Sequence, residues 1–119
     1  QTLTALSATV GATLLPQKST AAPKSPFTYC LNLSTIRGQK LGFVKEIEVA
    51  AQAGFRSVEI WVETLETFLK NGGTLADARK RLGDLGVTVE GAIGFAQWIV
   101  DDAVVRAKGL EQLQREMDM

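Results

Sequence analysis

The feature that most constrains the fold is an alternation of strand and helix patterns, which runs three times from Phe27 onward. Strand patterns rich in β-branched and apolar residues occupy 27–33, 56–62 and 87–95. Helical patterns occupy 42–54, 63–70 and 75–85, and a last one follows Asp101 or Asp102, either of which can cap it. Strands and helices that alternate through short links form parallel sheets with right-handed crossovers. The sequence therefore predicts an α/β fold of three consecutive βα units with a parallel sheet.

Glycine and polar residues set the ends of these helices. Gly54 and Gly86 stand where two helical patterns stop, as expected of C-terminal glycines. Thr74 is expected to cap the helix over 75–85, with Asp77 at the capping-box position. The apolar residues of that helix predict one buried stripe, made of Leu75, Ala78, Leu82 and Leu85.

Each predicted strand has one apolar face and one face with polar groups, because side chains alternate between the two sides of a sheet. The apolar sets are Phe27, Tyr29, Leu31 and Leu33; Val58, Ile60 and Val62; and Val87, Val89, Gly91 and Ile93. The opposite sets are Thr28, Cys30 and Asn32; Ser57, Glu59, Trp61 and Glu63; and Thr88, Glu90, Ala92 and Gly94. A doubly wound sheet should be apolar on both faces. One polar face fits a barrel lumen better, so we predict that 27–119 is the N-terminal part of an incomplete (β/α)8 TIM barrel.

Glu90 is the residue that this barrel interpretation explains most directly. An ionised carboxylate in a dry strand would be strongly unfavourable without a partner. On a lumen face, Glu90 would instead lie in a solvated pocket beside Glu59. The alternative is that both carboxylates form salt bridges with neighbours such as Arg56 or Arg37.

Composition excludes several classes of function. The 119 residues carry 13 basic and 13 acidic side chains, and the basic residues are scattered, so we expect no nucleic-acid partner. The chain has no histidine and one cysteine, which excludes an internal disulfide, a cysteine-cluster metal site and Ser-His or Cys-His nucleophilic catalysis. Cys30 is expected to be a small buried apolar residue.

Residues 1–26 differ in composition from the rest of the chain. They contain no acidic and no aromatic residue, and the apolar run from Leu3 to Leu15 is too short and too weakly hydrophobic to span a membrane. Small residues around Ala21 suit a signal peptidase. We interpret the segment as an export-signal remnant of a periplasmic or secreted bacterial protein; the alternative is a disordered tail on a cytoplasmic protein.

Four stretches of the chain resemble the N-terminal part of the sugar phosphate isomerase/epimerase family, the xylose-isomerase-like TIM barrels. They are YCLNLSTIRGQKL, AAQAGFRSVEIWVE, GGTLADARKRLGDLGVTVEGAIGFAQWIVDD and RAKGLEQL. The resemblance implies a protein that isomerises or epimerises a small sugar or polyol, with a carboxylate taking a proton beside a carbonyl. It also implies a divalent metal (Mn, Mg or Zn) for the full-length family, whose ligands lie mainly on later strands. For this chain alone we expect no cofactor and no turnover.

The same resemblance implies substrate-binding roles for a small set of residues: Asn32, Glu59, Glu90, Trp61 and Trp98. Each has a plainer alternative. The tryptophans could fill core space, and Asn32 could cap a turn at the end of its strand. The competing function is a non-catalytic α/β binding or assembly module that associates through its open sheet edges. A flavodoxin-like domain is disfavoured because no glycine-rich phosphate loop follows a strand.

Overall fold

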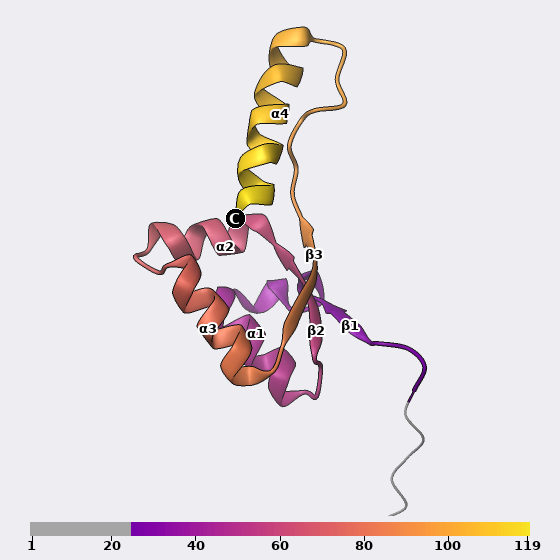
Figure 1. Ribbon diagram of the computed structural model, residues 1–119, viewed down its shortest axis with the longest axis vertical. Coiled ribbons are helices and arrows are strands. Elements are labelled where there is room, and N and C mark those ends of the chain that lie inside the picture. Colours follow the sequence, from indigo (N-terminus) through magenta and orange to yellow (C-terminus); the bar gives the residue numbers. More distant parts are fainter. Residues whose placement is uncertain (1–24) are drawn as a thin grey trace, which may run out of the picture.

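The computed structural model describes residues 25–119, and these form an α/β fold with a three-stranded parallel sheet and four helices (Figure 1). In chain order the elements are β1 (Cys30–Asn32), the 3-10 turns η1 (Leu33–Thr35) and η2 (Arg37–Gln39), α1 (Phe43–Gln52), β2 (Ser57–Trp61), α2 (Val62–Lys70), α3 (Leu75–Leu85), β3 (Thr88–Ile93) and α4 (Ala103–Asp118). The predicted order of strands and helices is confirmed.

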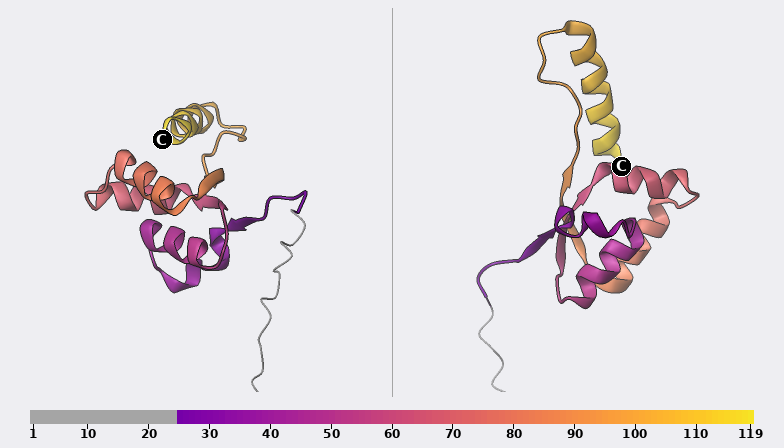
Figure 2. Two further views of the ribbon diagram at one scale, coloured as in Figure 1. Left: turned by 60° about the horizontal axis from the view of Figure 1, so that its bottom comes forward. Right: turned by 180° about the vertical axis from the view of Figure 1, so that it is seen from behind.

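The sheet has one covered face and one open face. Its strands follow the order β1-β2-β3, and both neighbouring pairs are parallel. Helices α1, α2 and α3 all lie on one side of the sheet in two opposite views (Figures 1 and 2). We call the other side the open face.

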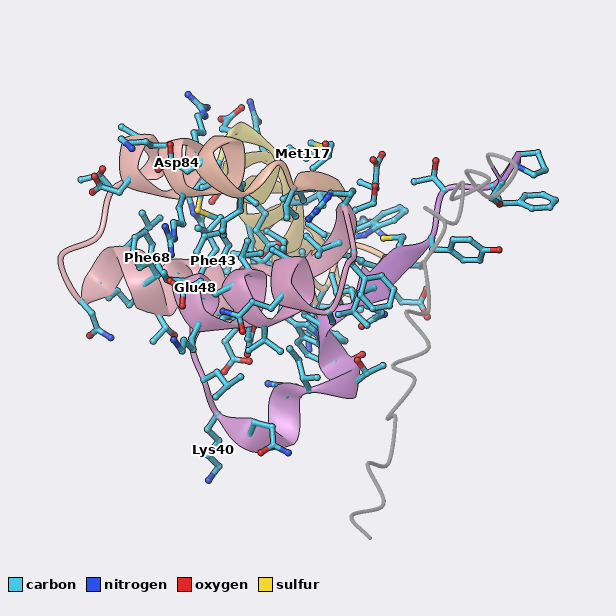
Figure 3. The ribbon with its side chains drawn as sticks, turned by 90° about the horizontal axis from the view of Figure 1, so that it is seen from below. Lys40, Phe43, Glu48, Phe68, Asp84 and Met117 are labelled. Atoms are coloured by element: carbon cyan, nitrogen blue, oxygen red, sulfur yellow. The ribbon has the colours of Figure 1, made fainter. Side chains whose placement is uncertain are left out.

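The hydrophobic core lies between the sheet and these helices. Leu33, Ile47 and Val58 are its largest fully buried side chains. Phe43 of α1 and Phe68 of α2 pack with their ring centroids 5.5 Å apart, and both are labelled in Figure 3. Burial of such side chains, at roughly 1.5–3 kcal/mol each, is what holds the helices on this face.

The predicted ends of α3 are confirmed in detail. The Thr74 hydroxyl accepts a hydrogen bond from the Asp77 backbone N–H at 3.1 Å, and the Asp77 carboxylate accepts one from the Thr74 backbone N–H. Gly86 ends the helix in the left-handed conformation, with φ of 61°. Of the predicted buried stripe, Ala78 is buried, whereas Leu75, Leu82 and Leu85 are half-buried.

The first strand is shorter than predicted. Only Cys30–Asn32 pairs with β2, and Leu33 already begins a 3-10 turn. Phe27 and Tyr29, predicted on the apolar face, are 73% and 69% exposed because no helix of the described part packs against them. Cys30 was predicted to be buried and is exposed.

A β-bulge changes the predicted alternation of β3. Val58 pairs with Val89, but the next residue, Glu59, pairs with Gly91, so Glu90 is an additional residue on β3. The predicted alternation holds up to Glu90 and is inverted beyond it. Gly91 pairs with Glu59 and Ile93 pairs with Trp61, so both lie on the same face of the sheet as these residues. Ala92 lies on the face that the helices cover.

Two further expectations concern the chain ends and the membrane. The proposed export-signal remnant, residues 1–26, falls almost entirely on residues 1–24, which lie outside the described part. Within residues 25–119, no helix combines the length and the apolar character that crossing a membrane requires.

Candidate functional site

The open face brings four of the five predicted site residues together. The Asn32 amide nitrogen donates a hydrogen bond to Glu59 Oε2 at 2.6 Å, which joins β1 to β2. The Ser57 hydroxyl donates one to Glu90 Oε1 at 3.0 Å, which joins β2 to β3. Ser57, Glu59 and Trp61 are two positions apart along β2, so they share one side of the sheet. The prediction that Asn32, Glu59 and Glu90 lie on one side, opposite the helices, is confirmed.

Asn32 is held in one orientation by its position at the end of β1. The side-chain oxygen Oδ1 of Asn32 accepts a hydrogen bond from the Ser34 backbone N–H at 2.8 Å and so caps η1. The Ser34 hydroxyl donates to the same oxygen. The side-chain amide nitrogen of Asn32 is thereby directed at Glu59. Asn32 thus caps a turn, as one interpretation predicted, and also places a polar group on the open face.

Glu59 and Glu90 do not form the salt bridges considered as an alternative. Within residues 25–119, the ion pairs involve other carboxylates, and Arg37 pairs with Glu63 at 2.7 Å. Arg56 donates instead to the backbone carbonyls of Ala51 and Phe55. In the described part of the chain, neither carboxylate therefore forms an ion pair; Glu59 accepts a hydrogen bond from an amide and Glu90 accepts one from a hydroxyl.

Trp61 lies at the carboxyl end of β2 on the same face, between two side chains. The Arg37 guanidinium lies 3.8 Å from the centroid of the indole, and the Phe95 ring centroid is 5.3 Å away. A cation over an indole is a favourable contact. Because Arg37 covers one face of the ring, stacking of a sugar there would require Arg37 to move. The indole Nε1 is buried and has no hydrogen-bond partner in the described part of the chain.

Trp98 does not join this cluster. It lies in the segment between β3 and α4, is 44% exposed, and lines an apolar cavity of about 530 Å³. The lining includes Leu82, Val89 and Met117, which places the cavity on the helix side of the sheet. Trp98 therefore lies beyond the end of β3, beside α4, and outside the group formed by Asn32, Glu59 and Glu90.

The predicted site does not include three residues that the structure places on the open face: Cys30, Ser57 and Arg37. Cys30 lies two positions before Asn32 on β1 and so shares the open face; partial desolvation, and then the negative charges of Glu59 and Glu90, raise the pKa of its thiol. The alternation of side chains along a strand places Ser57 on the same face as Glu59, and Cys30 on the same face as Asn32, so the sequence alone could have identified both. Arg37 could not, because only the fold of the η1–η2 turn places it over Trp61.

The open face does not make a metal site of its own. No group of three or more His, Cys, Asp or Glu side chains within the described residues is arranged to hold a metal ion. Glu59 and Glu90 supply two carboxylates, whereas catalytic sites usually hold an ion with three or four protein ligands. What this arrangement can do is accept and donate hydrogen bonds to the hydroxyl groups of a polar ligand.

Comparisons with known proteins assign no family. A scan against protein-family models finds no match to this sequence, and a search of curated proteins finds none either. The interpretation of the open face therefore depends on its geometry and on the residues that form it.

Proposed function

We propose that residues 27–119 form the first three βα units of a (β/α)8 barrel of the sugar phosphate isomerase/epimerase type. The observation that carries the proposal is the contrast between the two faces of the sheet. Leu31, Val58 and Ile60 pack under helices, while Asn32, Glu59 and Glu90 occupy the face that no helix of residues 25–119 covers (Figure 1). In a closed barrel, that polar face would line the lumen, where ligands bind at the carboxyl ends of the strands.

In this proposal the open-face residues contact the substrate rather than a metal. The carboxylates of Glu59 and Glu90 would accept hydrogen bonds from the hydroxyl groups of a sugar or polyol, and Asn32 would keep Glu59 in place. A divalent ion, which the family resemblance implies, would polarise the carbonyl of such a substrate. This chain's donor set does not fit that ion, so we assign it no step through a metal.

Turnover assays test the catalytic part of the proposal. We expect the purified chain to interconvert no ketose–aldose or epimer pair, with or without Mn²⁺, Mg²⁺ or Zn²⁺, because two carboxylates on an open sheet cannot form a dry, preorganised site. Turnover that is abolished by both Glu59→Gln and Glu90→Gln, and retained by Glu66→Gln, would show instead that the chain is a minimal enzyme.

A non-catalytic assembly module is the second candidate. It is favoured by the sheet order, which leaves β1 and β3 each with one strand neighbour within the described part. The genomic sequence after the codon for Met119 separates the two candidates. An open frame that continues into further βα units, with Glu, Asp and His at strand ends, supports the barrel; a stop codon supports the module.

A further inference from the structure

The segment after β3 stands away from the rest of the fold as an arm. β3 continues into an irregular stretch over 94–102, and α4 then returns toward the body, so that its C-terminal end lies near α2 (Figure 1). Most of the large hydrophobic side chains that are exposed lie on this arm: Phe95, Trp98, Ile99, Val104, Val105, Leu110 and Met117. Exposed apolar side chains gathered on one element are typical of an interaction surface.

One side of α4 packs against the irregular stretch and is not available. A Cβ on Gly109 would lie 2.3 Å from the carbonyl oxygen of Gln97, so the helix and the stretch touch at this position. Leu113 and Glu116 are half-buried on the same side. The Arg106 guanidinium also donates to the Val100 carbonyl oxygen at 2.9 Å, which ties the first turn of α4 to the stretch.

A different side of α4 carries a seam with the spacing of a coiled coil. Its residues follow one another at alternating intervals of four and three positions, and all five are exposed: Ala103, Ala107, Leu110, Gln114 and Met117. An alternation of four and three is the heptad spacing by which two helices pack side by side. Leu110 is 50% exposed and Met117 is 71% exposed, so most of the seam surface is uncovered within the described residues, although Met117 also borders the cavity lined by Leu82 and Val89.

The charges beside this seam fit a second copy of the same helix. Arg106 and Glu111 are five positions apart on its two flanks, the spacing at which charged residues pair across two parallel helices. In a parallel pair, each Arg106 faces Glu111 of the second copy, twice by symmetry, and can donate to it through the guanidinium N–H groups that do not bond to Val100. In an antiparallel pair, the flank that carries Glu111 would instead face the same flank of the second copy, so Arg106 and Glu111 would not meet. Gln114 is a polar residue within the seam, and such residues fix the register of paired helices.

We propose that α4 is a dimerisation helix, which pairs in parallel with α4 of a second copy through the seam Ala103, Ala107, Leu110, Gln114 and Met117. This surface is distinct from the open face and from the sheet edges. Two heptads with alanine at two of the five seam positions form a small interface, so the dimer is a weak one.

Sedimentation of the full chain over a wide concentration range tests the dimer. We expect a monomer–dimer equilibrium that Leu110→Lys abolishes. Arg106→Glu and Glu111→Arg should each weaken the dimer about tenfold, since each replaces two attractive pairs with two repulsive ones. The double variant Arg106→Glu/Glu111→Arg should restore the dimer. Lys108→Glu makes the same charge change on α4 away from the seam and should have no effect.

The orientation is tested with a single thiol in the seam. In a Cys30→Ser background, Gln114→Cys should form a disulfide-linked dimer upon mild oxidation with diamide, because parallel pairing places the two residues opposite each other. A chain that stays monomeric at high concentration would overturn the proposal. So would a dimer that is insensitive to Leu110→Lys, or one that the double charge reversal fails to restore.

Discussion

The side-chain amide nitrogen of Asn32 lies 2.6 Å from Glu59 Oε2, on the neighbouring strand, although the two residues are 27 positions apart in the chain. The same asparagine caps the turn that follows β1, through its other side-chain atom. One residue therefore fixes the end of β1, the start of the connection to α1 and the position of a carboxylate on the open face. The polar groups of this face are organised by the strands beneath them.

Asn32→Ala should lower the free energy of unfolding by about 1–2 kcal/mol, because it removes both a cap and a hydrogen bond to a charged group. Urea denaturation followed by circular dichroism measures the change. Thr28→Ala, on the exposed segment before β1, is the matched control and should change stability by less than about 0.5 kcal/mol. Equal effects of the two substitutions would show that the Asn32 contacts contribute nothing.

The Cys30 thiol should react slowly for an exposed cysteine. Although the residue is exposed, partial desolvation of the thiol and then the charges of Glu59 and Glu90 raise its pKa above the ordinary 9.0, so less of the reactive thiolate is present near pH 8. The rate of reaction with a disulfide reagent should increase in Glu59→Gln and in Glu90→Gln, and remain unchanged in Glu66→Gln. Unchanged rates in the first two variants would contradict the grouping of these side chains on one face.

Glu46 should make the protein less stable as pH rises. It is 4% exposed on α1, and burial raises the pKa of its carboxyl, while the charge of Arg37 partly opposes this effect. The folded state then binds a proton on Glu46 more tightly than the unfolded state does. The resulting contribution to the free energy of unfolding is complete below pH 4.5 and is lost as pH rises through the raised pKa.

Urea denaturation at a series of pH values checks this sign. Glu46→Gln should be more stable than the original chain at pH 7, and its stability should change less between pH 4 and pH 8. Glu66→Gln, at the surface of α2, should keep the original pH dependence. A Glu46→Gln variant that is less stable at pH 7 would indicate that the carboxylate is ionised and well solvated in the folded state.

Two glycines in helices should respond oppositely to alanine. Gly109 has no room for a Cβ beside Gln97, so Gly109→Ala should separate α4 from the irregular stretch and increase amide hydrogen exchange across 94–102. Gly83 of α3 has nothing within 4 Å of that position. Gly83→Ala should therefore stabilise the fold by about 0.5–1 kcal/mol through helix propensity. Increased stability in both variants would contradict the packing of α4.

Much of the fold could be predicted from local sequence signals. The capping box at Thr74 and Asp77 depends on a spacing of three residues, and Gly86 ends its helix by the conformational freedom of glycine. The parity of β2 placed Ser57, Glu59 and Trp61 on one face because that strand is regular. Such features depend on a few adjacent residues and need no knowledge of the rest of the chain.

Other features depend on contacts that the local pattern does not contain. The bulge at Glu90 arises from how β3 pairs with β2, and one additional residue inverted the predicted faces of Ala92 and Ile93. Phe27 and Tyr29 fit a strand by composition, but no helix of residues 25–119 packs against them and both are exposed. The resemblance predicts Trp98 in the site, but the chain between β3 and α4 carries it beyond the end of the sheet, where it lies against α4.

The most direct test of the barrel proposal is a titration of the ¹⁵N-labelled chain with aldoses, ketoses and their phosphates, followed by two-dimensional NMR. The account predicts weak binding, with Kd of the order of millimolar, because part of a barrel supplies few contacts. The shifted amides should be those of Asn32, Glu59 and Glu90, and the shifts should disappear in the Glu59→Gln/Glu90→Gln double variant. Shifts centred on Trp98 and the apolar cavity, or no shifts with any sugar, would contradict the assignment of the open face as the substrate-facing surface.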